Sequence, residues 1–296
     1  MNGAALKAIA PWLGGKRTIG PEIVRELGPH RAYWEPFCGS AAVLFAKEPS
    51  QQETVNDLHA MLVNLARVLA DPGQSIELYE RACKTLSSTD LYFRSAEWLE
   101  SLPVEQVLDN PDAAYHYLVV SWQGRNGTSG SVRTNFAPSV RYTPGGGSSP
   151  TRWRSAVESI PAWHERLRNV HILCEDAFAL IEKVSDERGV VIYADPPYVA
   201  DSRARGGGSR YLHDFDDDDH ARLAGLLRRF RNVRVVVSYY DHPLIRRLYD
   251  GWTVVDKARQ KNLHVQNRRG AGRCQAPEVL LINGPSYAED EAPRLF

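Results

Sequence analysis

Short apolar runs rich in valine and isoleucine recur along the chain and predict buried β-strands. Each run is only four to six residues long, which is the length of a strand rather than of a helix. The last two runs are separated by a loop without a long helical segment, which permits an antiparallel pair. The predicted strands are residues 31–35, 53–56, 170–174, 190–194, 233–238, 252–257 and 278–283.

Between these strands, leucine and aromatic residues at helical spacing predict helices. Residues 71–120 are predicted to be helical without any strand, with breaks at Pro72, Pro103 and Pro111. Strands and helices alternate before and after this stretch, which indicates an α/β fold. The other predicted helices are residues 19–27, one that ends near residue 70, 151–168, 177–184, 216–230 and 241–249.

A length of 296 residues suits one large domain or a domain with a sizeable insertion, and 43% apolar residues are enough for a packed core. The four cysteines lie far apart and form no Cys-x-x-Cys pair, so neither a disulfide framework nor a metal site is indicated. The N-terminus lacks a signal-like pattern, and no apolar stretch approaches the ~18 residues of a membrane span. We therefore expect a cytoplasmic protein.

The 36 basic and 36 acidic residues balance to a net charge of zero, so total charge does not indicate a nucleic-acid partner. Residues 121–154 and 257–273, however, carry basic residues and no acidic one. The first stretch also contains aromatic residues, as a surface that contacts phosphates and guanine edges would. A flexible low-complexity segment is the alternative. Arg125, Arg133 and Arg141 are the predicted DNA contacts, with Arg125 and Arg133 the candidates for reading bases.

The stretch VVIYADPPYVADS, residues 190–202, follows a buried strand with a carboxylate, two prolines and a tyrosine. Pro196 and Pro197 cannot continue the strand, so the chain turns at Asp195, where open α/β sheets carry ligands. Methylation of an exocyclic amine needs such residues, because acceptors on both N–H bonds keep the nitrogen lone pair free. Asp195 and the carbonyl of Pro196 are the predicted acceptors, and Tyr198 is predicted to stack on the base. A capped strand end whose tyrosine only packs is the alternative.

Two earlier segments have the character of a cofactor site. Residues 11–18, PWLGGKRT, form a glycine turn that carries Lys16, although an ordinary surface turn would look the same. Residues 31–46 predict a strand ending near Glu35, a small-residue loop through Gly39 and an Ala/Leu/Phe helix. This loop lacks the third glycine of GxGxxG, and no phosphate-binding Lys-Ser/Thr follows, so a cofactor without a pyrophosphate fits better.

A carboxylate also ends the second predicted strand. Asp57 directly follows residues 53–56, in the position from which a carboxylate accepts hydrogen bonds from ribose hydroxyls. A cap at the start of the following helix explains the same residue equally well.

In this order, the motifs resemble the Dam-type family of N6-adenine DNA methyltransferases. The resemblance spans residues 11–283, and its most specific parts are GGK, EPFxGxxA and DPPY. The family's glycine two residues beyond Gly39 is Ala41 here, a departure that we expect to tighten the cofactor loop. The motifs are GGK at 14–16, EPFCGSAAV at 35–43, NDL at 56–58, DPPY at 195–198 and EVLLIN at 278–283.

The resemblance implies an α/β fold with a Rossmann-like seven-stranded methyltransferase sheet and a mainly helical target-recognition insertion. Residues 1–70 and 166–296 would form the catalytic domain that binds S-adenosyl-L-methionine, and residues 71–165 the DNA-binding insertion. Asp57 would hold the ribose hydroxyls, Asp176 the adenine edge of the cofactor and Asp195 its amino-acid end. The implied cofactor residues are Trp12, Lys16, Glu35, Phe37, Gly39, Asp57, Asp176 and Asp195, and the implied catalytic residues are Asp195, Pro196, Pro197 and Tyr198.

The implied activity is methyl transfer to adenine N6 in double-stranded DNA, by base flipping and direct attack, without a metal. The same scaffold could instead methylate cytosine N4 or an RNA adenine. A non-catalytic DNA-binding protein and a nucleotide-dependent oxidoreductase are the remaining alternatives, and the missing GxGxxG disfavours the latter. A cognate restriction endonuclease is compatible with the family, although no residue identifies one.

Overall fold

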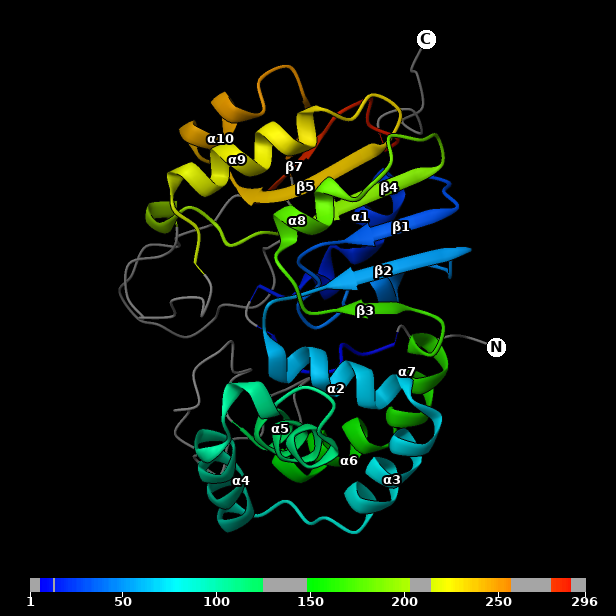
Figure 1. Ribbon diagram of the computed structural model, residues 1–296, viewed down its shortest axis with the longest axis vertical. Coiled ribbons are helices and arrows are strands. Elements are labelled where there is room, and N and C mark those ends of the chain that lie inside the picture. Colours follow the sequence, from blue (N-terminus) through cyan, green and yellow to red (C-terminus); the bar gives the residue numbers. More distant parts are fainter. Residues whose placement is uncertain (1–5, 13, 125–147, 203–213, 257–277, 289–296) are drawn as a thin grey trace.

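The computed structural model describes residues 6–12, 14–124, 148–202, 214–256 and 278–288. Its centre is one seven-stranded sheet in the order β3-β2-β1-β4-β5-β7-β6 (Figure 1). Every predicted strand is present. The strands are β1 (Ala32–Glu35), β2 (Gln52–Asn56), β3 (His171–Leu173), β4 (Val190–Ala194), β5 (Arg234–Tyr240), β6 (Thr253–Asp256) and β7 (Glu278–Ile282).

Strand β7 runs in the opposite direction to the other six strands. The predicted antiparallel pairing of the last two strands is confirmed, but β7 lies between β5 and β6 rather than at the edge. Glu278, the first residue of β7, therefore pairs with Tyr240, the last residue of β5. The start of β7 lies at the edge of the sheet where the parallel strands end.

The order of the strands reverses between β1 and β4. The chain moves outward from β1 to β2 and β3, and then returns to β4 on the other side of β1 before it continues to β5. Open α/β sheets bind ligands at such a reversal, outside the carboxyl ends of the strands. A site is therefore expected among the loops that follow β1, β2 and β4.

Both faces of the sheet are buried, which explains why every residue of β4 is apolar or aromatic. Val191 and Tyr193 pack into one hydrophobic cluster, whereas Val190, Ile192 and Ala194 pack into another. One face of the sheet is covered by α8 (Ala177–Glu182), α9 (Asp217–Arg228) and α10 (Pro243–Leu248). Helix α1 (Gly20–Leu27) packs on the opposite face and lies behind the sheet in Figure 1.

A layer of helices continues beyond β3 and shares the α1-side hydrophobic cluster with the sheet (Figure 1). Helix α5 is buried along almost its whole length, because α2, α3, α4 and α6 all contact it. The helical character predicted for residues 71–120 is confirmed. The helices are α2 (Ala60–Ala70), α3 (Pro72–Cys83), α4 (Thr89–Ser101), α5 (Pro111–Gln123), α6 (Ser149–Val157) and α7 (Ile160–Leu167).

Two predicted helices are wrong in detail. After Gly39 the chain forms turns and a single 3-10 turn, η2 (Leu44–Ala46), because Gly39 and Ala41 adopt positive φ angles of 46° and 60°. The predicted helix at 151–168 is two helices, α6 and α7. Pro161 lies in the first turn of α7, where its missing N–H prevents a continuous hydrogen-bond ladder.

The N-terminal segment is fixed between the helical layer and the loop after β1. The indole of Trp122 donates to the carbonyl of Ile9 at 2.9 Å, and the indole of Trp163 donates to the carbonyl of Lys7 at 2.6 Å. The N–H of Ile9 donates in turn to the carbonyl of Ser40 at 3.3 Å. These hydrogen bonds place the next part of the chain, which contains Trp12 and Lys16, beside the strand reversal.

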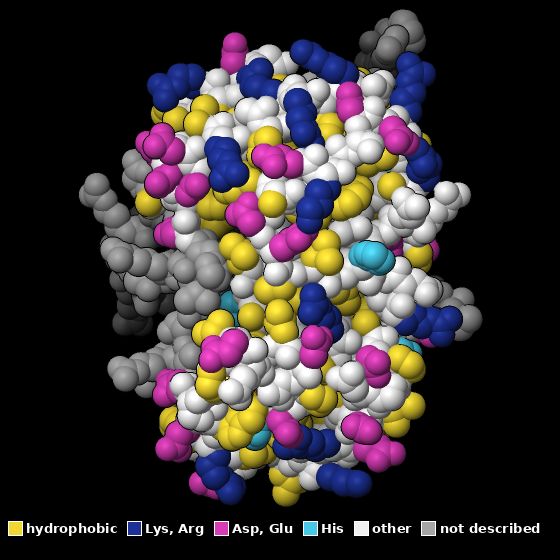
Figure 2. Space-filling model, viewed as in Figure 1, with side chains coloured by type: hydrophobic (Ala, Val, Ile, Leu, Met, Phe, Trp, Pro, Cys, Tyr) yellow, Lys and Arg dark blue, Asp and Glu magenta, His cyan; other side chains and the backbone are white. Residues whose placement is uncertain are grey.

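The surface in Figure 2 shows acidic and basic side chains interspersed, in keeping with the zero net charge of the chain. No continuous field of one sign is visible on this face of the described residues. None of the described helices is both long enough and apolar enough to span a membrane.

Candidate active site

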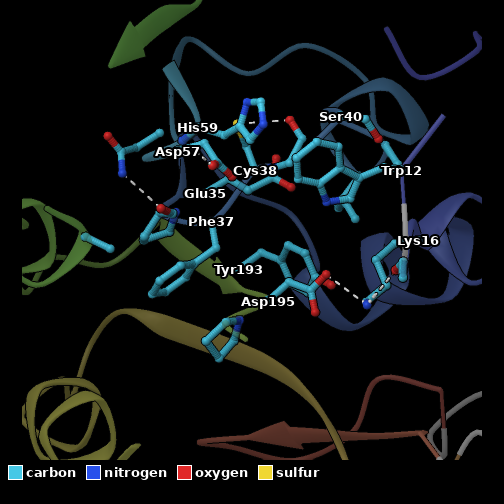
Figure 3. Close-up of a pocket in the computed structure, with 18 of the residues that line it drawn as sticks. Trp12, Lys16, Glu35, Phe37, Cys38, Ser40, Asp57, His59, Tyr193 and Asp195 are labelled. Carbon is cyan, nitrogen blue, oxygen red and sulfur yellow. Dashed lines mark hydrogen bonds and ion pairs between the residues drawn. The ribbon is translucent and has the colours of Figure 1, made fainter. Parts of the chain in front are cut away.

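A pocket opens at the strand reversal, between the ends of β1 and β4 (Figure 3). It holds about 970 Å³ of empty space, including its open mouth. The loops after β1, β2 and β4 line it together with the N-terminal glycine turn and the start of α8. The predicted site residues that line this pocket are Trp12, Lys16, Glu35, Phe37, Gly39, Asp57, Asp195, Pro196 and Pro197.

Backbone N–H groups hold Asp57 at the edge of the pocket. Gly39 N–H donates to Oδ2 at 2.8 Å, and His59 N–H donates to Oδ1 at 2.9 Å. Helix α2 is capped by His59 instead, whose Nδ1 accepts from Leu62 N–H at 3.2 Å. The helix-cap explanation of Asp57 is therefore wrong. Each carboxylate oxygen of Asp57 has a second lone pair with which it can accept a further hydrogen bond.

The loop after β1 packs closely against Trp12. A Cβ at Gly39 would lie 2.8 Å from Nε1 of Trp12, so a side chain at this position would displace the indole. The Trp12 ring also packs edge-on against His59, with ring centroids 5.4 Å apart. A glycine is required here by both its positive φ and the approach of the indole.

Glu35 ends β1, lines the pocket and is only 2% exposed. Tyr33 OH donates to its Oε2 at 2.9 Å. Burial raises the pKa of Glu35 to about 8, although the hydrogen bond from Tyr33 and the charges of Lys47 and Arg166 oppose the rise. At neutral pH the pocket therefore contains this carboxyl mainly in its neutral form.

Asp195 follows β4 directly and receives three hydrogen-bond donors. Lys16 Nζ lies 2.8 Å from Oδ2, while Ser238 Oγ and Tyr198 OH lie 2.9 Å and 3.1 Å from Oδ1. Burial raises the pKa of Asp195 above its ordinary value, and the charge of Lys16 opposes that rise. The DPPY loop thus presents a partly buried carboxylate, which is held by Tyr198 of the same loop and by Lys16 and Ser238 from two other parts of the chain.

Lys16 is 5% exposed, and oxygen atoms surround its ammonium group. Burial alone would lower the pKa of Lys16, but the carboxylates of Asp195 and Glu278 hold it above its ordinary value, so the group stays charged. Lys16 therefore joins the first motif to the DPPY loop, as the dashed contact in Figure 3 shows. The oxygens around Nζ are the Gly14 carbonyl at 2.9 Å, Tyr198 OH at 2.6 Å, Asp195 Oδ2 at 2.8 Å and Glu278 Oε1 at 3.1 Å.

A second hollow adjoins the pocket, and Trp12 and Lys16 line both. Its other walls include Tyr198, Tyr240 and Glu278. Tyr198 is only 3% exposed, and the centroid of its ring lies 4.4 Å from that of Tyr240. The ring on which we predicted a base to stack is therefore in contact with Tyr240 in this structure.

Among the predicted site residues that the structure describes, Asp176 lines neither space. Asp176 is exposed and caps α8, because its Oδ1 accepts from Ala179 N–H at 2.9 Å. The neighbouring Ala177 lines the pocket. Arg125, Arg133 and Arg141 lie outside the described residues. These assignments remain predictions from the sequence.

Asn56 is one of the supporting residues that the sequence analysis did not single out. Its side chain is fully buried and donates to the carbonyls of Pro36 and Glu175, each at 3.0 Å, while its Oδ1 accepts from Glu175 N–H at 2.9 Å. Asn56 thus connects the loops after β1, β2 and β3. Its place in the NDL motif, directly before Asp57, was the available signal.

Ser238 and Glu278 were missed for a different reason. Each is a lone polar residue within or beside an apolar run, and both are buried. Their proximity to Asp195 and Lys16 depends on which strands are neighbours and on the direction of β7. No local pattern in the sequence contains that information.

Comparison with known proteins finds relatives that are named as DNA methyltransferases. The DNA adenine methylase of Vibrio cholerae is 26% identical over 283 residues, which cover 94% of this chain and 96% of that protein. The type II methyltransferase M1.LlaDCHI of Lactococcus lactis is 26% identical over 289 residues, covering 95% and 97%. The DNA N-6-adenine-methyltransferase of Escherichia phage P1 is 27% identical over 246 residues, and the match covers only 31% of that longer protein.

The family model of the D12 class N6 adenine-specific DNA methyltransferases matches residues 12–263. The match includes the glycine turn, the loop after β1, Asp57, the DPPY loop and most of the sheet. This span is most of the 296 residues and contains the pocket just described. The chain therefore belongs to the D12 class of N6 adenine-specific DNA methyltransferases, as the resemblance of its motifs predicts.

Proposed function

We propose that the pocket binds S-adenosyl-L-methionine and that the second hollow receives an adenine flipped out of double-stranded DNA. The observation that carries this proposal is the position of Asp195. It lines the pocket, while its hydrogen-bond partners Lys16 and Tyr198 line the hollow beside it. A carboxylate between the two spaces can contact both a cofactor and a target amine.

The charges around the pocket fit this cofactor. The carboxylates of Asp57, Asp195 and Glu278 outnumber the one ammonium of Lys16, so the site favours a ligand that carries positive groups. When bound, S-adenosyl-L-methionine supplies an electrophilic methyl group on a sulfonium sulfur. The pocket that Gly39 and Asp57 line would accommodate a nucleoside, and the remaining lone pairs of Asp57 could accept from its ribose hydroxyls.

Asp195 supplies the acceptor that the amine requires. A carboxylate has about four lone-pair sites; Lys16 and Ser238 occupy two of them, and the hydroxyl of Tyr198 lies within reach of a third. The remaining site can accept one N6–H of adenine, and the carbonyl of Pro196 is positioned in the same loop to accept the other. With both N–H bonds held, the N6 lone pair is free to attack the methyl carbon. Asp195 is then the group placed to accept the proton that N6 must lose.

Base stacking on Tyr198 requires a rearrangement, because Tyr240 now contacts the Tyr198 ring. Extrusion of a base costs a few kcal/mol, which stacking and contacts to the DNA backbone must offset. Residues 71–165 remain the proposed target-recognition insertion. Arg125, Arg133 and Arg141 remain the proposed DNA contacts.

The test is a single-turnover methylation assay with radiolabelled S-adenosyl-L-methionine and a DNA library that contains all short sequences. We expect label in N6-methyladenine, and a loss of at least about 10²-fold in rate for Asp195→Ala, the scale of one preorganised polar contact. Circular dichroism must show that the variant is folded. Label in cytosine, label only in RNA, or a folded Asp195→Ala variant with the parent rate would contradict the proposal.

A further inference from the structure

Glu278 is a buried glutamate at the start of the EVLLIN motif, and the sequence analysis gave it neither a catalytic nor a cofactor-binding role. It begins β7 and is 5% exposed. Because β7 is antiparallel to β5, Glu278 pairs with Tyr240 at the carboxyl end of β5. Strand β5 in turn lies next to β4, which ends directly before Asp195. Strand direction thus delivers a second carboxylate to the catalytic edge of the sheet.

Glu278 and Asp195 share the same donors. Lys16 Nζ lies 2.8 Å from Asp195 Oδ2 and 3.1 Å from Glu278 Oε1. Tyr198 OH lies 3.1 Å from Asp195 Oδ1 and also 3.1 Å from Glu278 Oε1. A tyrosine hydroxyl has one proton, so it can donate to only one of the two carboxylates at a time.

The ammonium of Lys16 is in a similar position. It has three N–H donors, and four oxygens lie within hydrogen-bonding distance of Nζ. Each donor that Glu278 takes is one that Asp195 does not receive. Without Glu278, the hydroxyl of Tyr198 would donate to Asp195, and the ammonium of Lys16 would pair with Asp195 as its sole carboxylate among these two.

We propose that Glu278 is a positioning residue for methyl transfer, which draws the donors of Lys16 and Tyr198 away from Asp195 and so leaves Asp195 an acceptor for the target amine. This inference rests on the proposed function of the site. Glu278 itself touches neither reacting group. It acts through Lys16 and Tyr198, whose positions it fixes from the far side of the second hollow.

The positioning role of Glu278 affects the pH dependence of methyl transfer, because Asp195 must be ionised to accept the proton of the target amine. Burial is the main cause that raises the pKa of Asp195, and the negative charge of Glu278 adds to the rise while Lys16 opposes it. The neutral variant Glu278→Gln therefore lowers the pKa of Asp195. The titratable groups that face Asp195 are Lys16 from the N-terminal turn, Glu35 from β1, Tyr193 from β4, Tyr198 from the DPPY loop, Tyr239 from β5 and Glu278 from β7.

The experiment measures single-turnover methylation of DNA between pH 5 and 9 for the parent and for Glu278→Gln. We expect the plateau rate of Glu278→Gln to fall by about 10- to 100-fold, the usual effect of removing a partner that orients a reacting group. The acid limb of its profile should move to lower pH, since Asp195 then ionises more easily. A merely structural role for Glu278 would lower the rate and leave the acid limb in place.

Two further variants serve as controls. Glu187→Gln removes an exposed carboxylate that pairs with Arg31, and it should match the parent in both rate and profile. Glu278→Asp keeps the charge but shortens the side chain, so it should lower the plateau and leave the acid limb at the pH of the parent. If Glu278→Gln does not fold, as judged by circular dichroism, the equally neutral Glu278→Ala provides the test, since it should also move the acid limb to lower pH.

The outcomes separate this inference from the proposed function. An active parent whose Glu278→Gln variant keeps the parent plateau, or loses rate with an unmoved acid limb, overturns the positioning role alone. A Glu278→Asp variant with the parent plateau also overturns it. A parent that transfers no methyl group to adenine overturns the proposed function, and the positioning role with it.

Discussion

The two sides of the site are built in different ways. On the cofactor side, around the ends of β1 and β2, Asp57 is held by backbone N–H groups of Gly39 and His59. On the catalytic side, Asp195 is held by charged and hydroxyl side chains that include Lys16 and Tyr198. The first side depends on the shape of two neighbouring loops, whereas the second depends on contacts between the start, middle and end of the chain.

This difference predicts how each side responds to substitution. A carboxylate held by backbone groups can be removed without leaving a charge in the interior. When a buried ion network loses one member, the remaining charges stay in the interior without a partner and without hydration, which destabilises the fold. The catalytic side should therefore be fragile in stability, and the cofactor side mainly in affinity.

The largest effect is expected for Lys16→Met. This change leaves the buried Glu278 and the partly buried Asp195 without their shared cation, and it should destabilise the fold by about 3–5 kcal/mol. Chemical denaturation monitored by circular dichroism measures this. The matched control is Lys183→Met, whose exposed pair with Glu175 should contribute less than about 1 kcal/mol. Equal effects for the two variants would show that the Lys16 network is not a stabilising feature.

Glu35→Gln tests the buried carboxyl of the cofactor side through pH. The pKa of Glu35 rises from its ordinary 4.5 to about 8 on folding, so the folded state binds a proton that the unfolded state has already released. Stability is therefore lost as pH rises from 4.5 to 8 and is constant above that. Glu35→Gln cannot ionise, so it should be more stable than the parent by up to a few kcal/mol at pH 9 and similar to it at pH 4.

Thermal unfolding at pH 4, 6 and 9 checks this prediction. The Tyr33 hydroxyl keeps an acceptor in Glu35→Gln, so the comparison isolates the charge. A variant whose stability follows the parent at every pH would show that folding does not raise the pKa of Glu35.

Asp57→Ala should affect cofactor binding more than folding. The carboxylate is proposed to accept hydrogen bonds from ribose hydroxyls, so its loss should weaken S-adenosyl-L-methionine by about 1.5–3 kcal/mol, or roughly ten- to 150-fold. Calorimetric titration measures the affinity. Because Gly39 N–H and His59 N–H lie beside the open pocket, water can replace the carboxylate, and the fold should be retained. Unchanged affinity would remove Asp57 from the cofactor site.

The smallest effect is expected for Ala41→Gly, which restores the glycine of the family. Ala41 has a φ of 60°, and relief of this conformation should gain about 1–2 kcal/mol. Loss of the buried methyl group and the greater freedom of glycine in the unfolded chain should cost about 0.8 and 0.5–1 kcal/mol. The net change should therefore be less than about 1 kcal/mol. Gly39→Ala is the matched contrast, and it should be much worse because its Cβ meets Trp12.

Much of the fold follows from local patterns. Apolar runs predict the central strands β4, β5 and β7 because a strand that is buried on both faces must be apolar at successive positions, as β4 is. Pro72 and Pro111 mark the starts of α3 and α5 because proline is tolerated in the first turn of a helix. The turn at Asp195 is likewise local, since two prolines cannot continue a strand. These features can be predicted from the sequence because each depends only on residues that are adjacent in the chain.

Other features depend on the tertiary structure alone. The missing helix after Gly39 follows from positive φ angles at Gly39 and Ala41, which the composition of that stretch conceals. The role of His59 as the cap of α2 depends on the exact start of that helix.

The sequence by itself determined the seven strands, the turn after β4 and the set of residue types at the site. The tertiary structure decided their partners, because hydrogen-bond distances depend on which strands are neighbours and in which direction each one runs. Ser238 reaches Asp195 because β5 lies beside β4, and Glu278 reaches Lys16 because β7 is reversed. The contact of Tyr240 with Tyr198 has the same origin, since it joins the end of β5 to the loop after β4.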